Sequence, residues 1–432
     1  MGRRIVPLLC IAFALSCATS DRDRAWVRHA LAARGTQTAG ANDLAARSRD
    51  GLDEDDAVAT ALARSPVYQA DLARIDTARA DLDEAQRPAN PQLTLMAALG
   101  PISAFATLLA PLESLWQLPY RSAVAARALE AVASSLVQSG LDLARDARLA
   151  HSARALAEDR VRIRRDLARI SEQLNTLAQQ RLDVGEAAPA ESAAMRAEAA
   201  LARDAHAISV SEREIARAEL RAVLGLERDA PRFELAFRRS PVVPTALEPL
   251  LRAARHARPD LCAAEFALTA ALARAGWEHA RIVAVAAQLE GHWTKPDVLA
   301  ARAGGRIELP LFGANPGGIG RAEAEISRAR AQLSATRQRV VLEVMRARTS
   351  ALQAQASLER YRNEVRPALQ QALDSAEQSY ALGEDSYTAV LDLARRSGEA
   401  QLREAELLAQ TRRADAELER AVGGRMQIGT SL

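Results

Sequence analysis

Aromatic residues are scarce in this chain of 432 residues. They make up 3% of the sequence, although 49% of it is hydrophobic. Much of the apolar content is alanine, so the large side chains of an ordinary globular core are missing. Alanine, leucine, arginine, glutamate and glutamine dominate long stretches, and all are strong helix formers. The composition therefore predicts long, thin helices whose backbones approach one another closely.

Lysine is almost absent, and no run of basic residues replaces it. Lys295 is the one example, and the formal net charge of +2 is spread over interspersed acids and bases. This pattern argues against a nucleic-acid partner. Cysteine is also rare, with three in the chain: Cys10 and Cys17 near the N-terminus and Cys262 in a helical stretch. If Cys10 is removed with an export signal and Cys17 carries a lipid, Cys262 is the one free thiol, and no disulfide framework is expected within one chain.

Motifs for catalysis and for metal binding are missing as well. The glycine-rich segment 313–320 has no lysine after it and lies at an expected strand-to-helix turn, which argues against a phosphate-binding loop. The six histidines are scattered without the spacing of metal ligands. The carboxylates form no recognisable acid–base pair. We therefore predict a protein that is not an enzyme and has no metal site and no cofactor.

The N-terminus has the pattern of an export signal. Two arginines precede an apolar run at residues 5–15, which is too short to span a bilayer. Small residues then precede Cys17, as in a bacterial lipobox, although Ala14 stands where leucine is commonest. We interpret residues 1–16 as a signal peptide, Cys17 as a site of covalent lipid attachment, and 17–52 as a tether. The alternative is an ordinary signal peptide with an incidental cysteine.

Long helical stretches carry a sustained apolar repeat of seven residues. One helix is expected from about residue 122 to 182, and its heptad positions are Leu149, Leu156, Ile163, Ile170 and Leu177. A period of 3.5 residues held over this length predicts a left-handed supercoil against neighbouring helices. About 60 residues of helix would span roughly 90 Å, which suits a rod rather than a globular domain.

Short apolar segments between glycines and prolines predict two β-hairpins, at about 91–112 and 283–312. The second strand of the later hairpin is expected at 305–311. Trp116, Trp277 and Trp293 lie beside these segments. They would suit a membrane–water boundary, and ordinary packing at a strand–helix junction is the alternative.

The second half of the chain replays the first. Three pairs of corresponding residues lie 193, 198 and 198 positions apart, namely Pro66 and Pro259, Gly185 and Gly383, and Gly225 and Gly423. Near-constant offsets across helix breakers and helix ends indicate duplication. We divide the chain into repeat 1 (53–250, tip at 183–186), repeat 2 (251–424, tip at 381–384) and a tail (425–432).

Three segments together resemble the TolC-like outer-membrane efflux family. They are GRIELPLF at 305–312, AEQSYALGEDSYTAVLD at 376–392, and RPDL at 258–261. The first is similar to the family's strand end and the second to its helical tip. The resemblance covers roughly residues 53–424. Within the family, the sequence is loosely similar to the heavy-metal-efflux branch.

The resemblance implies a mainly α-helical chain with a small β part, in which three chains form a periplasmic helical tunnel and a 12-stranded outer-membrane β-barrel. Four strands per chain cannot close a transmembrane barrel alone. The resemblance also implies that the tip dipeptides, Val184 with Gly185 and Leu382 with Gly383, contact a periplasmic adaptor. The adaptor would lead to an inner-membrane pump of the resistance-nodulation-division type.

The resemblance makes Asp392 a candidate for a gate that narrows the tunnel. Ala389 stands where family members often carry a second acidic residue, and a plain solvated helix face is the alternative for Asp392. We predict a lipid-anchored outer-membrane channel that conducts drugs or metal ions passively within a tripartite efflux pump. The alternatives are a channel for type I protein secretion and a periplasmic coiled-coil lipoprotein that acts as adaptor or spacer.

Overall fold

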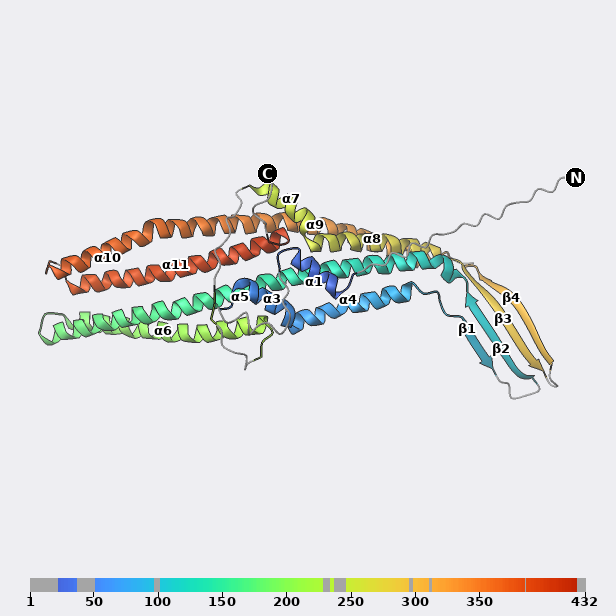
Figure 1. The fold of residues 1–432 in the computed structure, drawn as a ribbon, viewed down its shortest axis with the longest axis horizontal. Coiled ribbons are helices and arrows are strands. Elements are labelled where there is room, and N and C mark those ends of the chain that lie inside the picture. Colours follow the sequence, from blue (N-terminus) through green and yellow to red (C-terminus); the bar gives the residue numbers. More distant parts are fainter. Residues whose placement is uncertain are drawn as a thin grey trace.

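The chain forms a long rod of nearly parallel helices with a small sheet at one end, bent away from the rod axis (Figure 1). The expected mainly helical fold with a small β part is confirmed. None of the described helices is long and apolar enough to cross a membrane. The computed structural model describes residues 22–36, 51–96, 102–227, 234–236, 246–294, 298–310, 313–384 and 386–425.

Each half of the chain contains two short helices, a β-hairpin and two long helices. The first half consists of α3 (Glu54–Arg64), α4 (Pro66–Ala85), β1 (Gln92–Met96), β2 (Ile102–Pro111), α5 (Glu113–Asp183) and α6 (Pro189–Val223). The second half consists of α7 (Leu247–Ala257), α8 (Pro259–Ala280), β3 (Ala284–Thr294), β4 (Val298–Glu308), α9 (Pro316–Arg360), the π-helix η2 (Tyr361–Val365), α10 (Arg366–Ala381) and α11 (Tyr387–Val422). The order of elements is thus the same in both halves.

The two hairpins form one antiparallel sheet with the order β1-β2-β3-β4. Its central pair, β2 with β3, joins the two halves of the chain, with Ala104 opposite Trp293 and Pro111 opposite Ala286. The sheet therefore exists only because both copies of the repeat contribute to it.

Helix α5 begins earlier than the sequence predicts. It starts at Glu113 and continues through Pro119, whereas the expectation placed its start near residue 122. The reason is a tertiary contact: the amide of Leu112 donates to the carbonyl of Val285 at 2.8 Å, which sets the helix start directly at the end of the strand. The carboxylate of Glu113 in turn accepts from the amide of Val285 at 3.2 Å. These bonds hold the first turn in place despite the proline.

Strand β4 also begins earlier than expected, at Val298 rather than near residue 305. It pairs with β3 along its whole length, up to Ala284 opposite Glu308. The small residues of this strand carry little strand propensity of their own, so the pairing partner rather than the local sequence determines its extent. Leu309 and Pro310, which the sequence places in the strand, lie beyond its end.

The segment at 17–52 is not simply a tether, because part of it is a packed helix, α1 (Arg24–Ala32). Asp23 caps this helix by accepting from the amide of Trp26 at 2.7 Å. Val27 and Leu31 are fully buried in the core of the first half. The sequence analysis missed this amphipathic face because the helix has only nine residues and follows a polar stretch of sequence.

Glycines fix the ends of both returning helices. Gly225 (φ 65°) follows α6 and Gly423 (φ 94°) ends α11, in a backbone region that favours glycine. A Cβ on Gly225 would lie 2.4 Å from the carbonyl oxygen of Arg64, and one on Gly423 would lie 2.9 Å from the carbonyl carbon of Ala257. Each returning helix therefore packs directly on the helix break of its own repeat.

His151 is a fully buried histidine that holds the chain before α3. Its Nε2 lies 2.8 Å from the carbonyl oxygen of Leu52, whose own backbone bonds to Glu234 and Ala236. Burial lowers the pKa of this imidazole below its ordinary value, and the nearby Arg412 acts in the same direction. The folded protein thus favours the neutral ring.

This burial makes the stability sensitive to mild acid. The unfolded chain binds a proton at His151 below about pH 6.5, whereas the folded chain does so only at lower pH, so stability is complete above pH 6.5 and falls as the pH decreases below it. His151→Gln keeps an amide donor for Leu52 but cannot titrate. We expect the thermal midpoint, followed by circular dichroism, to drop more between pH 7.5 and 5.5 for the wild type than for His151→Gln. Equal drops would contradict this role.

Candidate functional site

The sheet has one continuous apolar face. Alternation along each strand and the register between strands bring Leu93, Leu108 and Leu289 into one row across three strands. The described residues on this face are Leu93, Leu95, Ala104, Ala106, Leu108, Ala110, Val285, Ala287, Leu289, Gly291, Trp293, Ala301, Ala303, Gly305 and Ile307. Many of the large ones are exposed, Leu95 at 71% and Ile307 at 64%. A face of this size without a polar side chain needs an apolar environment.

The opposite face carries the polar side chains of the described strand residues. They are Gln92, Thr94, Thr107, Gln288, Glu290, His292, Arg302, Arg306 and Glu308. Glu290 accepts from the Gln288 amide and lies 3.6 Å from His292, and Arg306 pairs with Glu308 at 2.6 Å. These polar side chains therefore all lie on one side of the sheet, together with Met96, Phe105 and Leu109.

Both edges of this sheet are open. Within the described residues, β1 pairs only with β2 and β4 only with β3. Each edge strand therefore presents backbone groups that lack a partner strand. In a lipid environment these groups would have to be paired by another chain.

The helices form layers that are also open at two edges. Beside the sheet the order of contacts is α4, α5, α8, α9, and toward the far end it is α6, α5, α11, α9 with α10. On the α6 edge, Leu201, Ile208 and Ile215 form an exposed heptad row. On the α9 edge, Leu342 and Met345 are each 46% exposed. Apolar rows are thus exposed at both edges of the helical layer.

Both hairpin tips, between α5 and α6 and between α10 and α11, lie at the end of the rod far from the sheet (Figure 1). At the first tip the amide of Gly185 donates to Leu182 at 3.0 Å and that of Glu186 donates to Arg181 at 2.8 Å. This is a Schellman motif with the glycine (φ 81°) in the left-handed region. The second tip has the same pair of bonds, from Gly383 (φ 79°) to Tyr380 and from Glu384 to Ser379.

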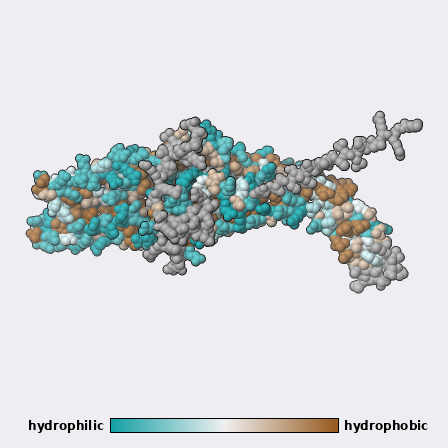
Figure 2. Space-filling view, in the orientation of Figure 1, coloured by the Kyte–Doolittle hydropathy of each residue, from teal (hydrophilic) through white to brown (hydrophobic). Residues whose placement is uncertain are grey.

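The tips expose apolar side chains. Val184 is 70% and Leu382 is 75% exposed. Neither tip glycine has an atom within 4 Å of the place where a Cβ would stand, so space does not require glycine there and the backbone conformation does. Two equivalent apolar points at the end of a hydrophilic rod form a suitable contact surface (Figure 2).

Asp392 lies on α11 about two turns from the second tip, and its carboxylate is 40% exposed. It pairs within its own helix with Arg395 and Arg396, each at 2.9 Å. Arg395 also reaches Glu399 at 2.6 Å and Glu198 of α6 at 3.7 Å. The hydrogen bond to Asp392 is the largest contribution that raises the pKa of Arg395. The acidic side chain is therefore part of a charged cluster rather than an isolated carboxylate.

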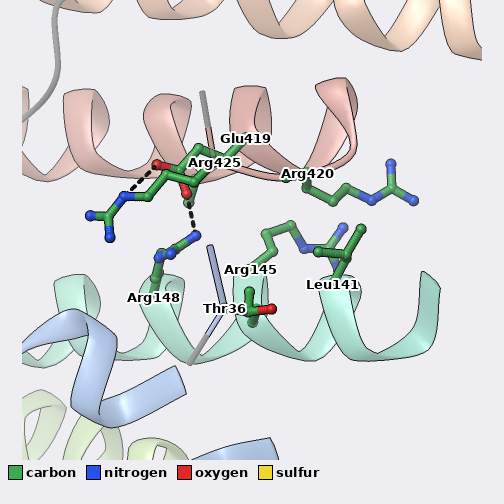
Figure 3. A pocket seen from close by; sticks show the side chains of 10 residues that line it. Thr36, Leu141, Arg145, Arg148, Glu419, Arg420 and Arg425 are labelled. Atoms are coloured by element: carbon green, nitrogen blue, oxygen red, sulfur yellow. Dashed lines mark hydrogen bonds and ion pairs between the residues drawn. The ribbon is translucent and has the colours of Figure 1, made fainter. Parts of the chain in front are cut away.

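A network of ion pairs at the middle of the rod joins the two repeats, and sequence reasoning missed it. Figure 3 shows Arg148 of α5 and Arg425 both directed at Glu419 of α11. Asp55 accepts from Arg425 at 2.9 Å and lies 3.6 Å from Arg148. The cavity among these residues has a volume of about 10 Å³, enough for about one water. The network is a structural link, not a ligand site.

A second group of ion pairs beside this network centres on Arg258, which is fully buried at the break between α7 and α8. It donates to Asp260 at 2.9 and 2.6 Å and to Glu343 at 2.6 Å. Burial alone would lower the pKa of this guanidinium, but the two carboxylates reverse the effect and raise it. Arg420 links Glu343 at 2.8 Å to Asp142 of α5 at 2.7 Å. The residues of this group are far apart in the sequence, so no local sequence pattern indicates their ion pairs.

The remaining sequence candidates fall into different places. Cys17 lies outside the described residues. Cys262 is half-buried, and burial raises the pKa of its thiol, which does not suit a nucleophile. Among the described residues no group of three or more histidines, cysteines or carboxylates could hold a metal ion.

The three tryptophans near the sheet differ from one another. Trp116 is 39% exposed and donates to the carbonyl of Ala280 at 3.1 Å. Trp293 is 45% exposed on the apolar sheet face. Trp277 lies beneath the guanidinium groups of Arg274 and Arg281, at 4.5 and 5.4 Å. The first two are placed for an external contact, and Trp277 is packed within the junction.

Solved outer-membrane channels share this fold, a rod of helical hairpins with a small sheet at one end. The family model of outer membrane efflux proteins matches residues 250–424. The resemblance to the TolC-like efflux family is thereby confirmed. No curated protein sequence matches the chain significantly.

Solved structures share the fold over most of the chain. The chain is similar to CusC, described for transmembrane channel formation, with 19% identity, coverage of 90% of this chain and 95% of that one, and a TM-score of 0.72. It is similar to the outer membrane protein VceC from Vibrio cholerae, with 18% identity, 86% and 96% coverage and a TM-score of 0.70. The open-state MtrE outer membrane channel from Neisseria gonorrhoeae has 18% identity, 85% and 88% coverage and a TM-score of 0.67.

Proposed function

We propose that this protein is the outer-membrane channel subunit of a tripartite efflux pump and conducts exported solutes passively. The observation that carries the proposal is the four-stranded sheet with one apolar face, one polar face and two open edges. A periplasmic spacer or adaptor would have no use for such a sheet, since its apolar face would be exposed to water. Type I protein secretion stays an alternative, because the same channel could serve it.

The open edges support a trimer. Adjacent strands of the sheet are antiparallel, so β4 of one chain would meet β1 of the next in the same antiparallel sense. Each added chain contributes four strands, and transmembrane barrels need at least about eight. We propose that three chains form a 12-stranded barrel. Its apolar face would contact lipid, and its polar face would line the channel. The apolar rows on α6 and α9 would meet between the same neighbouring chains.

The exposed tips support a partner at the opposite end of the rod. We propose that Val184 with Gly185 and Leu382 with Gly383 contact a periplasmic adaptor, which connects to an inner-membrane pump of the resistance-nodulation-division type. Cys17 would carry the lipid that anchors the N-terminus to the outer membrane, and the mass of the mature N-terminal peptide measures this attachment.

Adjacent residues of β2 provide a test of the membrane orientation of the sheet. Leu108 lies on the apolar face and Thr107, opposite Glu290, on the polar face. An arginine on the lipid face near the bilayer centre costs about 2–4 kcal/mol in each chain, whereas an arginine at Thr107 would face water and a carboxylate. We expect Leu108→Arg to abolish heat-modifiable trimers in outer-membrane fractions and Thr107→Arg to retain them. Equal recovery of both variants as trimers would refute the barrel orientation.

The tips can be tested without altering the barrel. We expect Val184→Asp combined with Leu382→Asp to abolish copurification of the adaptor from cells that carry the complete pump, because both exposed apolar contacts become charged. Leu272→Asp is the matched control, since Leu272 is an exposed apolar residue of α8, 46% exposed and remote from the tips. Adaptor capture that survives the tip double variant in intact trimers would remove the tips from the contact.

The gate hypothesis for Asp392 predicts opposite effects from the two members of one ion pair. Asp392→Ala removes a negative charge, so we expect higher single-channel conductance in planar bilayers and weaker block by multivalent cations. Arg396 is 59% exposed and pairs with Asp392, so Arg396→Ala leaves that charge less compensated and should strengthen the block. Unchanged conductance and block in both variants would show that Asp392 lies on a plain solvated face.

A further inference from the structure

The apolar face of the sheet does not stop at the ends of the strands. Residues at even positions of β2 lie on this face, and Leu112, the next even position after Ala110, bonds through its amide to Val285. It is 39% exposed. On the neighbouring side of the sheet Leu309 follows Ile307 and is 63% exposed. The face thus extends beyond both strands into the junction with the helices.

Helix α5 continues this face for two turns. Leu115 and Trp116 lie three and four positions after Leu112, and Pro119 and Tyr120 follow at seven and eight, so all share one side of the helix. Leu115 is 61% and Tyr120 is 42% exposed. Figure 2 shows hydrophobic residues gathered at the junction of rod and sheet as well as along the sheet. We call Leu112, Leu115, Trp116, Pro119 and Tyr120 the neck stripe.

A neighbouring chain would not cover the neck stripe. Helices α5 and α8 are the central members of the layer beside the sheet, and its open edges are α4 and α9. The strands next to the stripe, β2 and β3, are likewise the central pair of the sheet. None of the described elements of a neighbouring chain would therefore cover the stripe, which lies on the side of the apolar sheet face.

The stripe has the chemistry of a bilayer interface. Trp116 donates its indole proton to Ala280 and leaves part of its ring exposed. The Tyr120 ring packs on Gly276, where a Cβ would lie 3.2 Å from it. Tryptophan and tyrosine with apolar bodies and polar handles concentrate at the level of lipid headgroups. The stripe ends before Arg127, which pairs with Glu130 on the same helix.

The dimensions agree with this assignment. Eight residues of helix from Leu112 to Tyr120 rise about 12 Å. The polar interface of a bilayer is roughly 5–8 Å thick on each side of the hydrocarbon core. The stripe is thus long enough to cross that interface on one side, whereas Trp293 lies at the opposite end of the apolar face.

We propose that the first two turns of α5 lie in the headgroup region of the periplasmic leaflet and bind phospholipid through the neck stripe. This inference rests on the proposed function, because it requires the apolar sheet face to lie in a bilayer. It adds that the membrane-contacting surface includes a helix and is not confined to the strands.

Depth-dependent fluorescence quenching tests this assignment. The chain has four tryptophans, and three single-tryptophan variants retain Trp116, Trp293 or Trp26, with phenylalanine at the others. Reconstituted into phosphatidylcholine vesicles, the Trp116 variant should lose more fluorescence to lipids brominated near the headgroup than to lipids brominated near the chain ends. The Trp293 variant reports membrane insertion of the sheet, and Trp26, which packs against the core of the first half, should stay unquenched.

The quenching of Trp293 tests the channel proposal, and the quenching of Trp116 tests the position of the neck stripe. Quenched Trp293 with unquenched Trp116 would overturn the neck assignment and leave the channel proposal intact. Absence of quenching at both positions would overturn both. A fourth variant, Leu115→Trp with all four natural tryptophans replaced by phenylalanine, guards against a local defect at position 116 and should be quenched in the same pattern as Trp116.

Discussion

The unpaired backbone at the two edges of the sheet is the constraint on which this architecture depends. An apolar sheet face suits lipid, and in lipid each unpaired amide or carbonyl costs several kcal/mol. One chain leaves β1 and β4 open, so it cannot satisfy that requirement alone. Duplication reduces the problem, because β2 and β3 of the two repeats pair with each other. Assembly of several chains is the remaining way to remove the edges.

The two repeats are tied together at the middle of the rod, where α5 exchanges its contacts with α4 and α8 for contacts with α6 and α11. Gly225 and Gly423 let each returning helix touch the helix break of its own repeat. Within repeat 2, Arg258 and Arg420 both pair with Glu343 of α9. Between the repeats, Arg420 pairs with Asp142 of α5, and Arg148 of α5 pairs with Glu419 of α11. Buried ion pairs of this kind contribute little net stability but penalise misaligned packing. They therefore favour one register of the two helical hairpins.

Sequence reasoning succeeded where the determinants are local and failed where they are distant. The tip glycines and the long helices were readable, because a left-handed turn and a helical pattern each depend on neighbouring residues. Helix α1 and the early start of β4 were missed, because burial by α5 and pairing with β3 decide them. The ion pair between Arg148 and Glu419 joins residues far apart in the chain, and no single-sequence pattern records such a contact.

The charged cluster around Asp392 limits how a gate at this position could act. A carboxylate that pairs with Arg395 and Arg396 contributes a weaker field to the tunnel than a free one, since the nearby positive charges cancel part of it. Arg395 also reaches Glu198 in the other repeat, so the same residue that screens Asp392 holds α11 toward α6. Movement of the second tip away from the first would break that link and leave the Arg395 guanidinium to Asp392 and Glu399 alone, so the charge of Asp392 would be more fully compensated. Charge in the tunnel and separation of the tips are thus coupled through one arginine.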